Sequence, residues 1–256
     1  MPDLSNKVIL VTGASKGIGA AIVRVLGENG ASVIGHYGSD RAGAEAALAA
    51  VPRERKLVLG CDLRDLGAVE RLWRDAVAWK GRIDVLVPNA AVLRFDGGFA
   101  ESDAQWDAVW ADTLQVNVMA VARLLRAAVK HYLERGGGSI VTISSWASQR
   151  GVTNPDTIAY AASKAAVKAA TQTIARAYAK QGILAYVIAP GVVGTGMSER
   201  FVETQSGGRG AVEAGLTMGE WIPPEDIAHT VAFLASGIAR HLTGATIDIN
   251  GASYLR

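Results

Sequence analysis

Short apolar runs alternate with segments of helical periodicity along almost the whole chain, and this alternation constrains the fold most. The first run, Val8–Val11, is followed by glycines and then by apolar residues at helical spacing up to Leu26. Further apolar runs cover residues 31–37, 56–59, 83–87, 139–143, 183–188 and 245–249, with helical patterns between most of them. Strands that are buried on both faces are continuously apolar, and the helices between them form right-handed crossovers. The pattern therefore predicts an α/β fold, a doubly wound Rossmann-like parallel sheet of about seven strands with helices on both faces.

Length and composition bound the remaining possibilities. The 256 residues suit one α/β domain, so we expect a single domain over residues 1–256. A net charge of +2 gives no argument for nucleic acid or an anionic membrane as partner. The single cysteine, Cys61, excludes an internal disulfide, and no apolar run has the form of a signal peptide or a membrane span. We expect a cytoplasmic protein, and the scattered histidines predict no metal site.

A glycine-rich loop, Thr12-Gly13-Ala14-Ser15-Lys16-Gly17-Ile18-Gly19, lies between the first strand and the first helix. Glycines permit a tight turn and close approach of a phosphate, and a helix N-terminus offers free N–H groups. A plain glycine turn is the alternative. The strand before the loop and the helix after it favour dinucleotide binding.

A tyrosine and a lysine, Tyr160 and Lys164, stand four residues apart in a helical pattern, which puts both side chains on one helix face. A free tyrosine has a pKa of ~10, and lowering it by about three units requires ~4 kcal/mol. A lysine charge ~4 Å away at an effective dielectric of ~20 supplies about that amount. The spacing predicts a general acid/base, although a chance pair on a solvated helix has the same spacing.

Two further positions carry polar groups that the apolar pattern does not explain. The strand over residues 139–143 ends in Ser144-Ser145, where a hydroxyl can stabilise charge on a carbonyl oxygen. Asn117 interrupts an apolar helical stretch. Capping serines and a surface asparagine are the plainer interpretations.

Together these motifs resemble the short-chain dehydrogenase/reductase family, in particular its 3-oxoacyl-[acyl-carrier-protein] reductase-like members, from about Lys7 to Tyr254. The resemblance implies an NADP-dependent oxidoreductase that interconverts a ketone and a secondary alcohol by hydride transfer, with Tyr160 as general acid/base. It assigns the catalytic set Asn117, Ser145, Tyr160 and Lys164, with the asparagine holding a water in a proton relay. The step from Ser145 to Tyr160 is two residues longer than usual in the family, so Ser144 stays an alternative.

The resemblance also implies the residues that bind the cofactor: Gly13, Ser15, Lys16, Gly17, Ile18, Gly19, Tyr37, Ser39, Arg41, Asp62, Leu63, Asn89, Ala90, Tyr160, Lys164, Pro190, Gly191, Val193 and Thr195. In NAD-specific relatives an acidic residue ends the second strand. Here Tyr37 takes that place, and Lys16 and Arg41 offer positive charge to a 2′-phosphate. We therefore expect NADP(H), with NAD(H) as the alternative and Asp40 as the contrary sign.

After the fourth strand the usual Asn-Asn-Ala-Gly of the family is replaced by Pro88-Asn89-Ala90-Ala91. Proline lacks an N–H, and alanine adopts a positive φ less readily than glycine. The sequence therefore predicts a slightly altered turn that still binds the cofactor.

Residues 194–221 show no clear period and include several glycines, which predicts a substrate lid at 196–221. The predicted inner face of the lid consists of Met197, Phe201, Leu216, Met218 and Trp221, with Leu93, Phe95 and Trp146 as additional wall. This composition predicts a small to medium carbonyl or alcohol substrate with an apolar portion.

Alanines crowd the helix near residues 159–181, which, with the habit of the family, predicts a homotetramer. Two other functions stay open for the chain: a non-catalytic dinucleotide-binding sensor, and a sugar or polyol dehydrogenase. The presence of both Tyr160 and Lys164 argues against the sensor.

Overall fold

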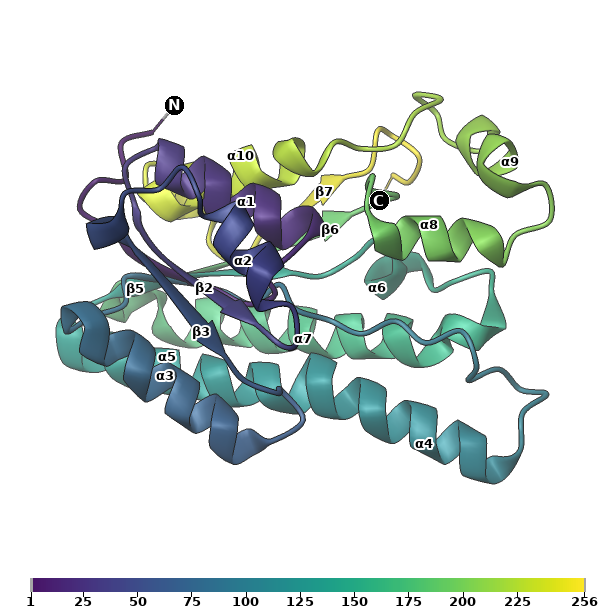
Figure 1. The fold of residues 1–256 in the computed structure, drawn as a ribbon, viewed down its shortest axis with the longest axis horizontal. Helices are drawn as coiled ribbons and strands as arrows, with labels where there is room; N and C mark the ends of the chain where they lie inside the picture. Colours follow the sequence, from purple (N-terminus) through teal and green to yellow (C-terminus); the bar gives the residue numbers. More distant parts are fainter. Residues whose placement is uncertain (1, 256) are drawn as a thin grey trace.

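A seven-stranded parallel sheet forms the centre of the protein in a computed structural model that describes residues 2–255 (Figure 1). The strand order is β3-β2-β1-β4-β5-β6-β7, and all six pairings are parallel. The strands are β1 (Val8–Val11), β2 (Ser32–Tyr37), β3 (Lys56–Gly60), β4 (Val85–Val87), β5 (Gly138–Ile143), β6 (Ile183–Pro190) and β7 (Thr246–Ile249). The predicted fold class is confirmed.

Helices cover both faces of this sheet. They are α1 (Gly17–Glu28), α2 (Arg41–Ala47), α3 (Leu66–Lys80), α4 (Asp103–Leu114), α5 (Val121–Arg135), α6 (Ala147–Arg150), α7 (Ile158–Tyr178), α8 (Gly196–Glu203), α9 (Gly208–Ala214) and α10 (Pro224–Ser236). In Figure 1, α1, α2 and α10 lie above the sheet, and α3, α4, α5 and α7 lie below it. Two separate apolar cores result, one between the sheet, α1 and α10, and one between the sheet, α3, α5 and α7.

The strand order determines where in the sheet the candidate site lies. From β1 the chain proceeds outward to β2 and β3, and then returns to the other side of β1 to form β4. The loops that leave the carboxyl ends of β1 and β4 therefore diverge to opposite faces, and a crevice opens between them. The glycine-rich loop follows β1, Asn89 follows β4, and Ser145 follows β5, so the predicted site residues meet at one edge of the sheet.

The long helical region expected over residues 103–134 is present, with one irregularity. Between α4 and α5 the helix widens into a π-helical turn, η2 (Gln115–Ala120), which contains Asn117. Such turns insert one extra residue into a helix and occur often at functional sites. Here the turn directs Asn117 into the protein, where its side chain is buried.

Residues 194–221 contain two short helices, α8 and α9, which the irregular pattern did not predict. Both are shorter than three turns, too short for a recognisable period, and α9 begins at two glycines of positive φ, Gly207 and Gly208. The segment returns to the sheet region through a bridge between Val193 and Ile222. Within residues 2–255, none of the helices is both long and apolar enough to cross a membrane.

Candidate active site

A cavity of about 530 Å³ opens at the carboxyl edge of the sheet. Fifteen of the nineteen residues expected to bind the cofactor line it: Gly13, Ser15, Lys16, Gly17, Ile18, Gly19, Ser39, Asn89, Ala90, Tyr160, Lys164, Pro190, Gly191, Val193 and Thr195. Four expected residues, Tyr37, Arg41, Asp62 and Leu63, are not part of this lining. The sequence-based set is therefore gathered in space, apart from the residues around the ends of β2 and β3.

Three glycines, Gly13, Gly17 and Gly19, shape the loop after β1 into a cradle, and a side chain at any of them would strain or block it. Gly13 and Gly17 have φ of +72° and +54°, in the left-handed region that favours glycine. A Cβ at Gly19 would lie 1.9 Å from the carbonyl oxygen of Gly13. The loop then enters α1, whose first residues, Gly17, Ile18 and Gly19, line the cavity, and the free N–H groups of a helix start suit a pyrophosphate. The residues present therefore fit a dinucleotide.

The glycine loop is fastened to the turn after β4. The Thr12 hydroxyl accepts the N–H groups of Asn89 and Ala90, each over 3.0 Å, and the Asn89 amide donates to the Thr12 carbonyl over 2.9 Å. Ala91 has no positive φ, so the turn forms without the glycine that the family usually has there. Asn89 and Ala90 line the cavity wall.

A buried histidine supports the same loop from below, which sequence reasoning missed. His36 Nδ1 accepts the N–H of Gly13 over 3.3 Å, and Nε2 lies 3.0 Å from the carbonyl oxygen of Cys61, to which it donates. Burial lowers the pKa of His36, with a smaller opposing effect from the bond to Cys61. The neutral imidazole thus joins the ends of β2 and β3 to the first glycine.

The two serines after β5 have different partners. The Ser144 hydroxyl donates to the carbonyl oxygen of Lys164 over 2.9 Å, which ties β5 to α7. The Ser145 hydroxyl instead accepts the N–H of Ala147 over 3.1 Å and bonds the Tyr160 phenol. Only Ser145 has its hydroxyl beside the tyrosine, which supports it as the catalytic candidate.

Burial dominates the titration of Tyr160 and Lys164. It raises the pKa of Tyr160 to about 12, against a smaller lowering by the Ser145 hydrogen bond. It lowers the pKa of Lys164 to about 8. The lysine Nζ donates to the carbonyl oxygen of Ile143 over 2.9 Å and lies 5.7 Å from the Tyr160 ring centroid. The net pKa of Tyr160 in the protein alone is therefore raised, and the role of Lys164 toward the tyrosine stays a prediction.

Asn117 lies behind the cavity wall. Its Oδ1 accepts the N–H of Val92 over 2.8 Å, and its Nδ2 donates to the Val92 carbonyl and to the Ser163 hydroxyl over 2.9 and 3.0 Å. Ser163 precedes Lys164 on α7. The side chain therefore joins the β4–α4 loop to α7, which carries Tyr160 and Lys164.

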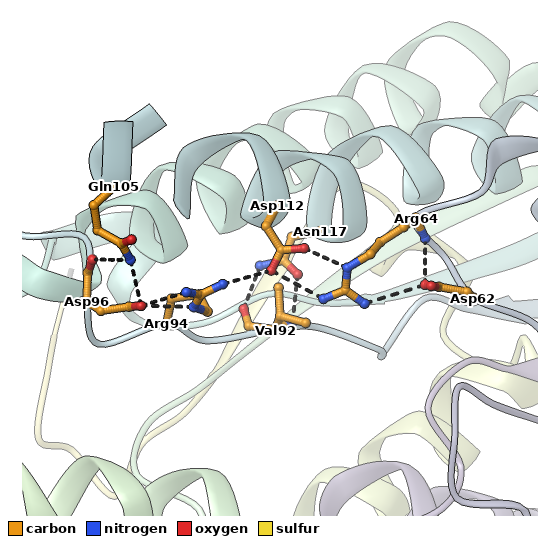
Figure 2. A network of polar contacts seen from close by, with 8 residues as sticks. All are labelled: Asp62, Arg64, Val92, Arg94, Asp96, Gln105, Asp112 and Asn117. Atoms are coloured by element: carbon orange, nitrogen blue, oxygen red, sulfur yellow. Dashed lines mark hydrogen bonds and ion pairs between the residues drawn. The ribbon is translucent and has the colours of Figure 1, made fainter. Parts of the chain in front are cut away.

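Figure 2 shows a chain of ion pairs along the same wall, which the sequence did not predict. Asp112 of α4 accepts from Arg64 over 2.7 and 3.2 Å and from Arg94 over 3.5 Å. Arg94 also pairs with Asp96 over 2.6 Å. Arg64, Arg94 and Asp112 all line the cavity.

The side chains near the end of β2 are engaged elsewhere. Asp40 caps α2 by accepting the N–H of Gly43 over 2.8 Å, and Arg41 pairs with Glu45 over 2.7 Å. The Tyr37 ring lies against Gly60. Of the two cations expected near a 2′-phosphate, Lys16 and Arg41, only Lys16 lines the cavity.

The predicted apolar wall is divided. Met197 and Leu93 line the main cavity, whereas Leu216, Met218 and Trp221 line a separate pocket of about 70 Å³. Phe95, Trp146 and Phe201 belong to neither lining, and the Arg150 guanidinium lies 4.6 Å from the Trp146 ring centroid. The described part of the chain brings no three His, Cys, Asp or Glu side chains together as a metal site.

Comparisons with known proteins identify the family of the chain. The family model described as enoyl-(acyl carrier protein) reductase matches residues 13–252. The chain belongs to the short-chain dehydrogenase/reductase family, as the sequence motifs predicted, and we class it as an oxidoreductase acting on CH–OH or carbonyl groups.

Particular relatives cover nearly the whole chain. It is 35% identical to the 3-oxoacyl-[acyl-carrier-protein] reductase FabG of Haemophilus influenzae, over 98% of this chain and 100% of that protein. It is 34% identical to the 3beta-hydroxysteroid dehydrogenase 1 of Eggerthella lenta, over 99% and 95%. The crystal structure of a dehydrogenase/reductase from Sinorhizobium meliloti 1021 superposes with a TM-score of 0.86 at 32% identity, over 99% of this chain and 97% of that one.

Proposed function

We propose that this protein is an NADP-dependent reductase that interconverts a ketone and a secondary alcohol, with Tyr160 as the general acid/base. One observation carries the proposal. The Ser145–Tyr160–Lys164 cluster and the glycine cradle line the same cavity. A dinucleotide held in the cradle would therefore share this cavity with a substrate beside Tyr160. The bound nicotinamide supplies hydride chemistry at the substrate carbon.

The chain's own residues protonate the carbonyl oxygen of the substrate and stabilise the charge that develops on it. The neutral phenol of Tyr160, whose pKa burial raises to about 12, donates its proton to the carbonyl oxygen as that oxygen gains charge. The Ser145 hydroxyl stabilises the same oxygen by a hydrogen bond. The Lys164 ammonium, buried and fixed to Ile143, stabilises the phenolate left behind.

The charges of the cavity support an anionic cofactor and favour NADP(H). Its lining carries five cations against two carboxylates, and because Arg64 and Arg94 pair with carboxylates, the cations left for an anion are Lys16, Lys164 and Arg200. Asp40 is occupied as the cap of α2, which weakens it as a ligand for a ribose 2′-hydroxyl. Lys16 is exposed in the glycine loop and is the residue we assign to a 2′-phosphate. Arg41, in its pair with Glu45, is a weaker candidate.

The substrate we propose is a carbonyl compound with an apolar portion, a 3-oxoacyl thioester before a simple ketone or a sugar. The names of the relatives cite acyl-carrier and hydroxysteroid substrates, both of which join an apolar body to a carbonyl or hydroxyl group. Leu93 and Met197 supply apolar wall beside the cluster. We propose residues 196–221 as the lid, since α8 contributes Met197, Ser198 and Arg200 to the cavity.

We also propose a homotetramer. The outer face of α7 exposes the small side chains Ala166 and Ala169, and Met119 and Leu133 on the neighbouring helices are nearly half exposed. Small residues let a second helix approach closely. Light scattering at micromolar concentration is expected to give four times the chain mass, and a monomer mass contradicts this part of the proposal.

A panel of ketones with NADPH and NADH tests the function. Loss of absorbance at the reduced nicotinamide band, with the higher kcat/KM for NADPH, is the expected result. Equal or better kcat/KM with NADH refutes the cofactor preference. Binding of NADPH without turnover of any ketone favours the non-catalytic sensor.

A further inference from the structure

Among the strands whose ends border the cavity, the one before Arg64 is the most distant, in strand order, from the strand before Ser145. The glycine cradle follows β1, Ser145 follows β5, and Arg64 follows β3, the edge strand beyond β2. In a doubly wound sheet the pyrophosphate lies at the helix after β1, and the adenosine half extends toward the end of β2. Arg64 therefore lines the adenosine side, while Tyr160 marks the nicotinamide side.

Both the backbone and the side chain of Arg64 are fixed. Its N–H donates to Asp62 Oδ1 over 2.9 Å, and its carbonyl oxygen accepts from the Gln115 side chain over 2.8 Å. Its guanidinium donates through Nε and Nη2 to the two oxygens of Asp112 over 2.7 and 3.2 Å. Nη1 lies 3.5 Å from Asp62 Oδ1 (Figure 2). Such two-point pairing fixes the plane of the group as well as its position.

Because the carboxylates bond N–H groups at the edges of the guanidinium, a ligand ring can approach it over the flat faces. Two of its edges are directed at carboxylates, which also balance its charge, so it is poorly placed to bind a phosphate. The side chain is 51% exposed, while that of Asp112 is only 18% exposed. A planar guanidinium stacks well on aromatic rings.

We propose that Arg64 is the stacking platform for the adenine ring of the cofactor, and that Asp112 is a positioning residue that holds this platform in place. The inference rests on the dinucleotide function proposed above. It adds a residue to the adenine side, where the expected Asp62 and Leu63 are not part of the cavity lining. Here Asp62 instead supports Arg64.

Calorimetry with fragments of the cofactor tests the platform. The probes are 2′-phosphoadenosine 5′-diphosphoribose, which carries adenine, and reduced nicotinamide mononucleotide, which does not. Arg64→Lys keeps the charge without the plane, and Arg64→Met keeps the length without either. Both variants are expected to bind the adenine fragment about 2- to 30-fold more weakly, the range of cation–π stacking. Binding of the mononucleotide is expected to change less than about twofold in either variant, because a lost stacking contact leaves the other fragment untouched.

Each other outcome overturns the platform. If Arg64→Lys binds like the wild type while Arg64→Met does not, the charge and not the ring face recognises the ligand. If both fragments weaken together and the melting temperature falls, Arg64 has a structural role only. If neither variant changes binding, Arg64 does not touch adenine. Failure of the wild type to bind either fragment contradicts the dinucleotide function itself.

A double-mutant cycle tests the positioning role of Asp112. Asp112→Asn is expected to weaken the adenine fragment in the wild type and to have little further effect in the Arg64→Met background, since the platform is already gone. An equal loss in both backgrounds overturns the positioning role. Glu70→Gln, which breaks the exposed pair with Arg123 between α3 and α5, is the matched control and is expected to leave binding unchanged.

Discussion

The Lys164 ammonium donates a hydrogen bond to the carbonyl oxygen of Ile143 over 2.9 Å, at the carboxyl end of β5. This bond holds a buried cation between β5 and α7, in the cavity that Ser145 and Tyr160 also line. Helical spacing alone therefore does not predict where the Lys164 side chain points or how the pKa values of Tyr160 and Lys164 shift. The lysine is directed to the strand end, and burial governs the pKa values of both groups.

Burial of Lys164 destabilises the folded protein below pH 8. Its pKa is 10.5 when unperturbed and about 8 in the fold. Between these values the unfolded chain binds the extra proton, so the free energy of unfolding rises with pH through this window, by up to about 3 kcal/mol. Below pH 8 the whole penalty is present.

Urea unfolding of the wild type and of Lys164→Met at pH 7 and pH 10 measures this effect. The wild type is expected to gain stability relative to the variant as pH rises, because only the wild type carries the titrating group. A constant difference between the two proteins at both pH values contradicts the buried, titrating lysine.

Ketone reduction is expected to slow above about pH 8. The Tyr160 phenol stays protonated until about pH 12, so the acid itself is present throughout. Lys164 loses its charge above about pH 8 and no longer stabilises the phenolate that proton donation leaves. The measurement is kcat against pH with saturating cofactor. A flat profile from pH 7 to 10 shows that Lys164 does not act through its charge.

His36 is expected to control cofactor affinity through the first glycine of the cradle. His36→Asn retains an acceptor near the place of Nδ1, and His36→Gln retains a donor near the place of Nε2. Losing the Gly13 bond costs about 1 kcal/mol, so His36→Gln is expected to bind NADPH several-fold more weakly than His36→Asn. Fluorescence titration gives the two dissociation constants. The same loss in both variants assigns His36 a packing role alone.

Local sequence patterns predict much of the fold and of the candidate site. Continuous apolar runs and helical periods predict the sheet, because burial on one or both faces leaves its period in the chain. The glycines of the loop are close to one another in sequence, and so are Tyr160 and Lys164. Within each of these two groups the spacing therefore predicts the local geometry. Ser145 needed the resemblance to be chosen over Ser144, and the structure supplies the physical reason in their different partners.

The rest depends on contacts between distant parts of the chain. Arg64 and Asp112 are 48 residues apart, and nothing local in either segment predicts their pair. His36 lies in a strand whose neighbours are apolar, so its bonds to Gly13 and Cys61 appear only once β1, β2 and β3 are assembled. The direction of the Tyr160 pKa shift follows from burial, which a helical spacing does not report.

The proton-donor role of Tyr160 is the central claim, and single-turnover reduction of a ketone by Tyr160→Phe with NADPH bound tests it most directly. The substitution removes one hydroxyl and keeps the ring. We expect a rate at least ~10²-fold below the wild type, the low end for loss of a general acid, with the dissociation constant for NADPH little changed. A rate near that of the wild type, with cofactor still bound, contradicts it.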